Sequence, residues 1–305
     1  MHEAGVFEEF KKNSRGGDAT IHLLYNHLGE KVFSVGEGRD SPEMDRWQIR
    51  KVLLTAIPKE KVVFSKPLVK SHRDEKSGEV VLTFSDGSTA SGFKLVVGAY
   101  GTWSKIRHLM EAMGGQGARI IMGDGKHMFN GRQGGGHYRI DIGLKGPEDF
   151  ANNAVNQSDF DAAKKFQLQE QHFGSYAPQF QEIIQQSEGP FRPWLMYYMP
   201  TDRLNWKPAQ DATLIGDAAH VTTPFVGDGV NCAMRDSCIL AEKIKELGVT
   251  QGAIAAYEKE MFSYAIDVIT RSLQSGKMFF ADDGPKEFLQ VMTAGNPLIG
   301  ASDGS

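Results

Sequence analysis

The sequence predicts a mixed α/β fold. Short β-rich runs such as EVVLTF at residues 79–84 alternate with segments whose apolar residues recur at helical spacing. A hydrophobic fraction of 40% in 305 residues is enough to bury a large core. No internal repeat or low-complexity segment interrupts this mixture of strands and helices. We therefore expect a globular chain of one large or two ordinary domains.

The first half of the chain is predicted to hold two helices followed by several strands. The helices are expected over residues 3–13 and 47–57, with a loop between them. The runs VVFSKPLV, EVVLTF and FKLVVGA then predict a hairpin that leads into a buried strand. Within residues 117–144, the runs ARIIMGDG, KHMFN and HYRIDIGL predict further strands. The glycine clusters at 114–117 and 134–136 are interpreted as loops, because no helix follows either of them.

The second half is predicted to be mostly helical. Helices are expected over residues 158–188, 231–247 and 251–275, and strands over 193–199 and 212–215. Cys232 and Cys238, the only cysteines, fall in one predicted helix and are expected to be reduced packing residues. We expect the tail that ends in GASDGS to be disordered.

Charge and hydropathy exclude several classes of partner. The net charge is -4 and there is no run of Lys or Arg, so no nucleic-acid or membrane-surface partner is expected. No apolar run approaches the roughly 20 residues that span a bilayer, and the start MHEAGVFEEF has no signal-peptide pattern. We expect a cytoplasmic protein without a membrane partner.

One stretch, LIGDAAHVTTPFVGDGVNCAM at residues 214–234, has the pattern of a ligand site. Its apolar strand ends at Gly216, so Asp217 stands at the carboxyl end of the strand, where its carboxylate can accept hydrogen bonds from sugar-like hydroxyls. Pro224 stiffens the following loop, while Gly227 and Gly229 allow the backbone to approach a ligand closely.

The helix that follows these glycines begins with free N–H groups. Together with the helix dipole, these groups suit a phosphate or a delocalised anion. The stretch therefore predicts a hydroxylated, phosphorylated cofactor. The alternative is a strand–loop–helix unit in which the glycines only turn the chain.

The segment GDAAHVTTPFVGDGVNCAMRDSCILA resembles the flavin-binding signature of the FAD-dependent aromatic hydroxylases, the single-component flavin monooxygenases. Two other segments are also similar to that family: KLVVGAYGTWSKIR at residues 94–107 and EMDRWQIRKVLLTAI at residues 43–57. The order and spacing of the segments, with a later helix containing EKEMFSYA, look closest to the branch with the tetracycline-inactivating monooxygenases.

The resemblance implies a remnant of a Rossmann-like FAD-binding sheet, a β-sheet substrate domain and C-terminal helices. Residues 94–99 and 212–215 are expected side by side in the first sheet, and residues 117–144 and 193–199 in the second. A discontinuous, partial FAD-binding domain would comprise residues 1–112 and 200–247. The substrate-binding domain would comprise 113–199, and a helical segment with a tail would comprise 248–305.

The resemblance also implies site residues. Asp217 would bind hydroxyls near the ribityl chain or pyrophosphate, the backbone of residues 227–231 would face the N1–C2=O edge of the flavin, and Arg50 would reach the pyrophosphate. The cofactor-binding set is Arg50, Gly216, Asp217, Pro224, Gly227, Asp228, Gly229, Val230 and Asn231. Arg50 could instead be a solvated arginine on an amphipathic helix.

On the substrate side, the implied residues are Phe225, Tyr138, Arg139, Met196 and Tyr198. A packing role stays open for Phe225, and a core strand is the favoured role for most of the others, because alternation puts half of their side chains into the packed face of the sheet. His220 is expected to cap the loop. No catalytic side chain and no metal ligand is expected, because the flavin itself carries out the hydroxylation.

The sequence departs from the family pattern in three places. It contains no G-x-G-x-x-G, Tyr100 stands where the family has an aspartate, and HLMEAMGGQGARI passes directly to a later strand of the substrate sheet. We therefore expect this chain alone to hold FAD less tightly than other family members. With no glycine-fingerprint strand beside residues 94–99, one strand edge is left open and self-association through it is expected.

Two functions follow from these patterns. In the first, the protein is an FAD-dependent monooxygenase that hydroxylates an aromatic or polyketide-like small molecule with NAD(P)H and O2. In the second, it is a shortened family member without redox activity, which acts as a non-redox enzyme or a small-molecule binding protein.

Overall fold

A computed structural model describes residues 1–38, 42–74, 77, 79–98, 118–133, 138–150, 159–188 and 191–293. Tyr100, both glycine clusters and the C-terminal tail, on all of which predictions were made, lie outside these residues. Within the described part of the chain, none of the helices has the length and apolar character needed to cross a membrane. Cys232 and Cys238 are both free thiols, as the sequence predicts.

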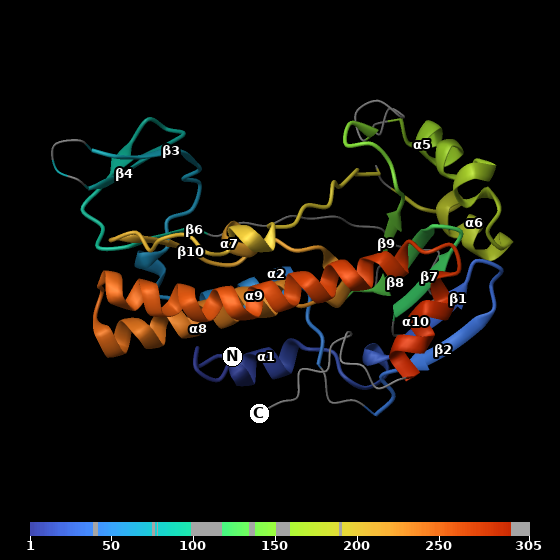
Figure 1. The fold of residues 1–305 in the computed structure, drawn as a ribbon, viewed down its shortest axis with the longest axis horizontal. Helices are drawn as coiled ribbons and strands as arrows, with labels where there is room; N and C mark the ends of the chain where they lie inside the picture. The colour runs from blue at the N-terminus through green and yellow to red at the C-terminus, as the bar shows by residue number, and fades with distance from the viewer. Residues whose placement is uncertain are drawn as a thin grey trace.

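The described residues up to Gly98 form two helices and six short strands (Figure 1). Their bounds are α1 Phe7–Asn13, β1 His22–Asn26, β2 Lys31–Val35, α2 Arg46–Thr55, β3 Leu68–Arg73, β4 Val80–Phe84, β5 Thr89–Ala90 and β6 Val96–Gly98, with 3₁₀ turns η1 Gly17–Thr20 and η2 Lys59–Lys61. The hairpin β1–β2 corrects the expected loop between the first two helices. The aromatic and β-branched residues of HLLYN and KVFSV are compatible with strands, but the pairing of the two segments is what completes the element.

The described part of the chain from Ala118 onward follows the predicted order more closely. Its elements are β7 Ala118–Gly123, β8 Lys126–Arg132, β9 Tyr138–Gly143, α5 Phe160–Gln167, η3 Glu170–Gly174, α6 Pro178–Gln185, η4 Thr201–Arg203, β10 Ala212–Leu214, α7 Asp217–His220, η5 Pro224–Val226, α8 Gly229–Leu247, α9 Gln251–Phe279 and α10 Gly284–Thr293. The helix α10 was not predicted.

A five-stranded sheet in the order β2-β1-β7-β8-β9 forms one end of the molecule (Figure 1). Strand β1 runs parallel to β7, and the other neighbouring strands are antiparallel. On one face of the sheet Ile121 and Met128 pack with α6, and on the other Met122 packs with Phe279 and Phe288. The hairpin β1–β2 lies in the range 1–112, which was expected to belong to the FAD-binding domain. It pairs, through β1 and β7, with the sheet of the range 113–199, the expected substrate-binding domain.

Strands β6 and β10 form a parallel pair, which confirms the predicted neighbourhood of residues 94–99 and 212–215. The register joins Ala212 to Val96 and Leu214 to Gly98. In the part of the chain that is described, β10 is the one strand that pairs with β6. Self-association through the other edge of β6 stays a prediction.

A small antiparallel sheet in the order β3-β4-β5 lies at the opposite end of the molecule from the five-stranded sheet (Figure 1). Strand β4 matches EVVLTF and forms the predicted hairpin with the residues that follow it, whereas β3 begins only at the end of the run VVFSKPLV. The whole architecture is α/β, as the sequence predicts, with long C-terminal helices.

The expected strand at residues 193–199 is not formed. The segment is extended but unpaired among the described residues, and its side chains from Trp194 to Tyr198 are exposed. Its aromatic composition suits a strand, but a strand also needs a neighbour of the right register. A backbone hydrogen bond from Met199 N to Val221 O, 2.8 Å long, places the end of this segment beside the loop after α7.

The helices α8 and α9 pack side by side along the long axis of the molecule, and α9 runs from the β6–β10 pair to the five-stranded sheet (Figure 1). Their contact buries Ile239 and Leu240 of α8 against Tyr257 and Met261 of α9. Near its start, α9 is also tied to β10, because Thr213 Oγ1 donates to Glu258 Oε1 at 2.9 Å.

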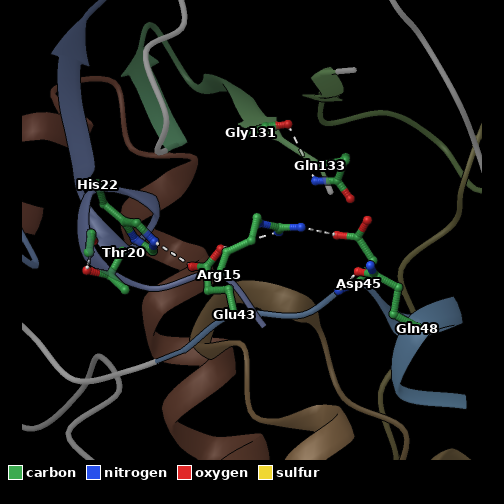
Figure 2. Close-up of polar contacts among 9 residues, drawn as sticks. Arg15, Thr20, His22, Glu43, Asp45, Gln48, Gly131 and Gln133 are labelled. Atoms are coloured by element: carbon green, nitrogen blue, oxygen red, sulfur yellow. Dashed lines mark hydrogen bonds and ion pairs between the residues drawn. The ribbon is translucent and has the colours of Figure 1, made fainter. Parts of the chain in front are cut away.

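A polar cluster fixes the start of α2 (Figure 2). Arg15 and Glu43 form a two-way backbone bridge, and the Arg15 guanidinium donates to Asp45 Oδ1 at 2.9 Å. The Asp45 N–H donates to Gln48 Oε1 at 3.3 Å, which is one half of a capping box. These contacts set the direction of the helix that carries Arg50.

Candidate functional site

The turn after β10 has a conformation that favours glycine. Gly216 has φ +59°, and a Cβ at this position would lie 3.0 Å from the Cβ of Ala233. The chain then enters the short helix α7 at Asp217, whose side chain is exposed. The exposed carboxylate therefore stands at the carboxyl end of β10, where the sequence predicted it.

A buried carboxylate holds this turn in place. Asp236 of α8 is completely buried and accepts a hydrogen bond from Gly216 N at 2.6 Å. His220 Nε2 lies 2.7 Å from the same carboxylate, and the Tyr264 hydroxyl donates to its other oxygen. Burial and the bond to Asp236 raise the pKa of the Tyr264 hydroxyl, which keeps it protonated as a donor.

The helix α9 holds the next loop. Ser272 Oγ donates to Thr223 O at 2.6 Å, and Ser275 Oγ donates to Phe225 O at 3.3 Å. Pro224 occupies the first turn of η5, which ends at Gly227 with φ +74°. Both Pro224 and Gly227 are exposed, so this loop presents its backbone on the surface.

The N-terminus of α8 is open. The side chain of Asp228, the N-cap residue, makes no capping bond and instead accepts from Arg271 Nη2 at 3.2 Å. The first-turn N–H groups of Gly229, Val230 and Asn231 are thus left for a ligand. A Cβ added at Gly227 or Gly229 would meet no atom within 4 Å, so free space borders this backbone.

These features fit a flavin. A free helix N-terminus and its dipole suit the N1–C2=O edge of a reduced flavin, which carries negative charge. The exposed Asp217 suits hydroxyls of a ribityl chain. The structure thus places the exposed Asp217 and the open backbone of residues 227–231 in the one segment that connects β10 to α8.

Arg50, the remaining cofactor residue predicted, is exposed on α2. No hydrogen bond or ion pair among the described residues joins its side chain to the turn after β10. Its role at the pyrophosphate stays a prediction.

Phe225 packs in an aromatic group with His127 of β8 and Phe279 and Phe280 at the end of α9. Ring centroids lie 5.8 Å apart for Phe225 and His127, and 5.1 Å apart for Phe225 and Phe279. Burial lowers the pKa of His127 to about 4, and Nδ1 of this imidazole has no hydrogen-bond partner in the described structure. The imidazole is therefore neutral near pH 7.

The four other predicted substrate residues lie away from Phe225 or on the open surface. Tyr138 is buried in the core on the α6 face of the five-stranded sheet, whereas Phe225 packs against the opposite face. Met196 and Tyr198 are exposed on the unpaired segment. Arg139 is exposed, and its Nε lies 2.9 Å from the Asp141 carboxylate.

A solvent-open pocket of about 590 Å³ lies beside Phe225. Its wall is formed by Phe225, the last turns of α9, the start of α10 and Lys145 after β9. The pocket thus joins the loop before α8 to the five-stranded sheet.

Sequence reasoning missed two parts of this site. Asp236 is part of the quoted flavin-type signature, so its position was visible, but its partner Tyr264 lies on a different helix. No signal in the sequence pointed to His127, because its aromatic neighbours come from elements far along the chain.

Comparison with known proteins gives the same picture. Residues 207–272 match the FAD binding domain family. The monooxygenase penA of Penicillium thymicola is 24% identical to this chain over an alignment 305 residues long. The alignment covers 79% of this chain and 68% of penA.

Two solved structures share the fold. HpxO of Klebsiella pneumoniae, complexed with FAD and uric acid, has a TM-score of 0.69 at 17% identity, covering 96% of this chain and 82% of HpxO. The tetracycline destructase Tet(51) has a TM-score of 0.61 at 14% identity, covering 96% and 80% of the two chains.

The comparisons favour the redox alternative over the non-redox one, and FAD is the cofactor that they support. The similarity to penA extends well beyond the flavin loop to most of the sequence. The chain is therefore similar to FAD-dependent monooxygenases over most of its length.

Proposed function

We propose that this protein hydroxylates an aromatic or polyketide-like small molecule, using FAD, NAD(P)H and O2. The observation that carries the proposal is the open backbone from Gly227 to Asn231, bordered by free space and left uncapped by Asp228. Bound FAD, once reduced, would supply the oxygen-activating chemistry.

The chain's own residues would bind and orient the cofactor. The N–H groups at the start of α8 would donate to the flavin carbonyl edge, and Asp217 would accept hydrogen bonds from the ribityl hydroxyls. Asp236 would keep both in register, because it contacts the turn before Asp217 and belongs to α8 itself. Phe225 would border both the flavin and the pocket beside it.

The test begins with reconstitution. Purified protein mixed with FAD should become yellow and quench flavin fluorescence. NAD(P)H oxidation should accelerate when an aromatic substrate is added, and isotopically heavy O2 should label the product. A protein that binds FAD but shows no substrate-stimulated oxidation and no labelled product would contradict the proposed reaction.

Two substitutions test the site itself. Asp217→Ala should weaken FAD binding by about 1–3 kcal/mol through loss of charge-assisted hydrogen bonds. Gly229→Val should weaken FAD binding more, because a branched side chain would fill the space beside the backbone. The exposed residue Asp202 provides a matched control, and Asp202→Ala should bind FAD like the parent protein. Parent-like FAD binding by both site variants would show that this loop is only a structural turn.

A further inference from the structure

The pocket beside Phe225 has the size and the mixed lining of a small-molecule site. Its volume of about 590 Å³ falls within the roughly 300–1,000 Å³ typical of such sites. Phe225 connects it to the loop that is expected to hold the flavin.

Two aromatic rings form part of the pocket wall. Phe225 and Phe280 meet edge to face with centroids 5.9 Å apart, and His127 packs against both. Gly276 of α9 makes room for Phe225, because a Cβ there would lie 2.7 Å from Cδ2 of that ring. These rings are held in place before any ligand arrives.

Four charged side chains line the same pocket: Lys145, Lys277, Asp282 and Glu287. None of the four forms an ion pair with another described residue. Lys145 Nζ donates to Phe280 O at 2.7 Å, which holds it at the pocket and leaves two of its N–H bonds for other acceptors. The pocket therefore offers two cations and two carboxylates without internal neutralisation.

Helix ends account for part of this arrangement. Lys277 lies in the last turn of α9 and Glu287 in the first turn of α10. The helix dipole stabilises a positive charge at the first of these places and a negative charge at the second. The dipole effect does not explain why both signs line one pocket, or why Lys145 and Asp282 join them from other segments.

We propose that the pocket binds an aromatic zwitterion, that is, an aromatic ring with both an ammonium and a carboxylate group, as in an aromatic amino acid. The carboxylate would lie at Lys277 and Lys145, the ammonium at Glu287 and Asp282, and the ring against Phe225 and Phe280. This inference rests on the proposed function, in which the ring beside Phe225 is the group that is hydroxylated.

Binding of three matched ligands to the full chain reconstituted with FAD tests the charge requirement. Calorimetric titration should show tryptophan binding about tenfold or more tightly than indole-3-propionate, which lacks the ammonium, and than tryptamine, which lacks the carboxylate. Equal affinity for all three, or tightest binding of a singly charged ligand, would overturn the proposal.

Two variants assign the charges. Lys277→Gln should weaken the binding of tryptophan and of indole-3-propionate and leave the binding of tryptamine unchanged. Glu287→Gln should weaken the binding of tryptophan and of tryptamine and leave the binding of indole-3-propionate unchanged. Lys286→Gln is the matched control on α10, since Lys286 is exposed and does not line the pocket. Uniform effects on all three ligands from either pocket variant would contradict the assignment.

FAD binding, measured separately, keeps the two proposals apart. Intact FAD binding and substrate-stimulated oxidation without a preference for the zwitterion would reject this inference and leave the proposed function standing. A preference for the zwitterion in protein that does not bind FAD would support the pocket assignment and reject the proposed function.

Discussion

Two regions along α9 each bury a titratable side chain, and they stabilise it in opposite ways. In the turn region, Asp236 is completely buried and is surrounded by donors from Gly216, His220 and Tyr264. In the aromatic region, His127 is 7% exposed and is surrounded by phenylalanine rings.

The difference separates two ways of fixing a site. Directional hydrogen bonds to Asp236 specify the position of a backbone N–H and two side chains, so the turn that presents Asp217 has one geometry. Packing around His127 fixes the shape of the aromatic region but offers no partner for a charged group. The stability of that region therefore depends on filled volume and on a neutral imidazole.

The largest effect is expected from removing the buried carboxylate. Asp236→Ala leaves Gly216 N, His220 and Tyr264 without their acceptor, and should lower the free energy of unfolding by about 3–5 kcal/mol. Urea unfolding followed by circular dichroism measures this loss. Tyr264→Phe removes one donor only and should cost about 1 kcal/mol. Equal stability of the alanine variant and the parent would show that the hydrogen bonds to Asp236 contribute nothing net.

The second effect concerns pH. His127 has a pKa of about 4 in the fold, against roughly 6.5 when unfolded, so the unfolded chain takes up this proton first as the pH falls. The contribution of neutral His127 is present in full above about pH 6.5 and is lost between there and pH 4, by up to about 3 kcal/mol.

The variant His127→Leu, which cannot titrate, isolates this contribution. Urea unfolding at a series of pH values should show a shallower fall in stability below pH 6.5 for the variant than for the parent. Parallel curves would mean that His127 is hydrated in the folded protein.

The smallest effect tests the packing of Phe225. Gly276→Ala should push this ring aside and cost about 1–3 kcal/mol, because its Cβ would lie 2.7 Å from the ring. Gly252→Ala on the same helix is the matched control, since its Cβ would meet only Thr250 Oγ1 at 3.6 Å. The control should be neutral or up to about 1 kcal/mol more stable. Both proteins can be compared by thermal unfolding.

The sequence predicted the turn region well because its information is local. Gly216, Asp217, Gly227 and Gly229 follow one another in a single stretch, and the positive φ of Gly216 and Gly227 favours glycine at both positions. The pairing of β6 with β10 was reached through the family resemblance.

The aromatic region could not be predicted in the same way. His127, Phe225 and Phe280 are far apart in sequence and meet only through tertiary packing. For the same reason the segment at residues 193–199 was wrongly predicted as a strand, and Tyr138 was predicted near the substrate although it faces the core on the α6 side. Alternation of side chains predicts that a strand has two faces, but not which face meets the ligand.

The length of α9 limits how this chain can change during evolution. Its 29 residues span about 44 Å without interruption, and they hold β10, the loop before α8 and the aromatic region from one side. Inserting one residue midway would turn everything beyond it by about 100° and advance it by about 1.5 Å. Such a change would separate Ser272 and Gly276 from their partners while leaving Tyr257 and Glu258 in place. Insertions and deletions are therefore expected in the surface loops of relatives and to be rare inside this helix.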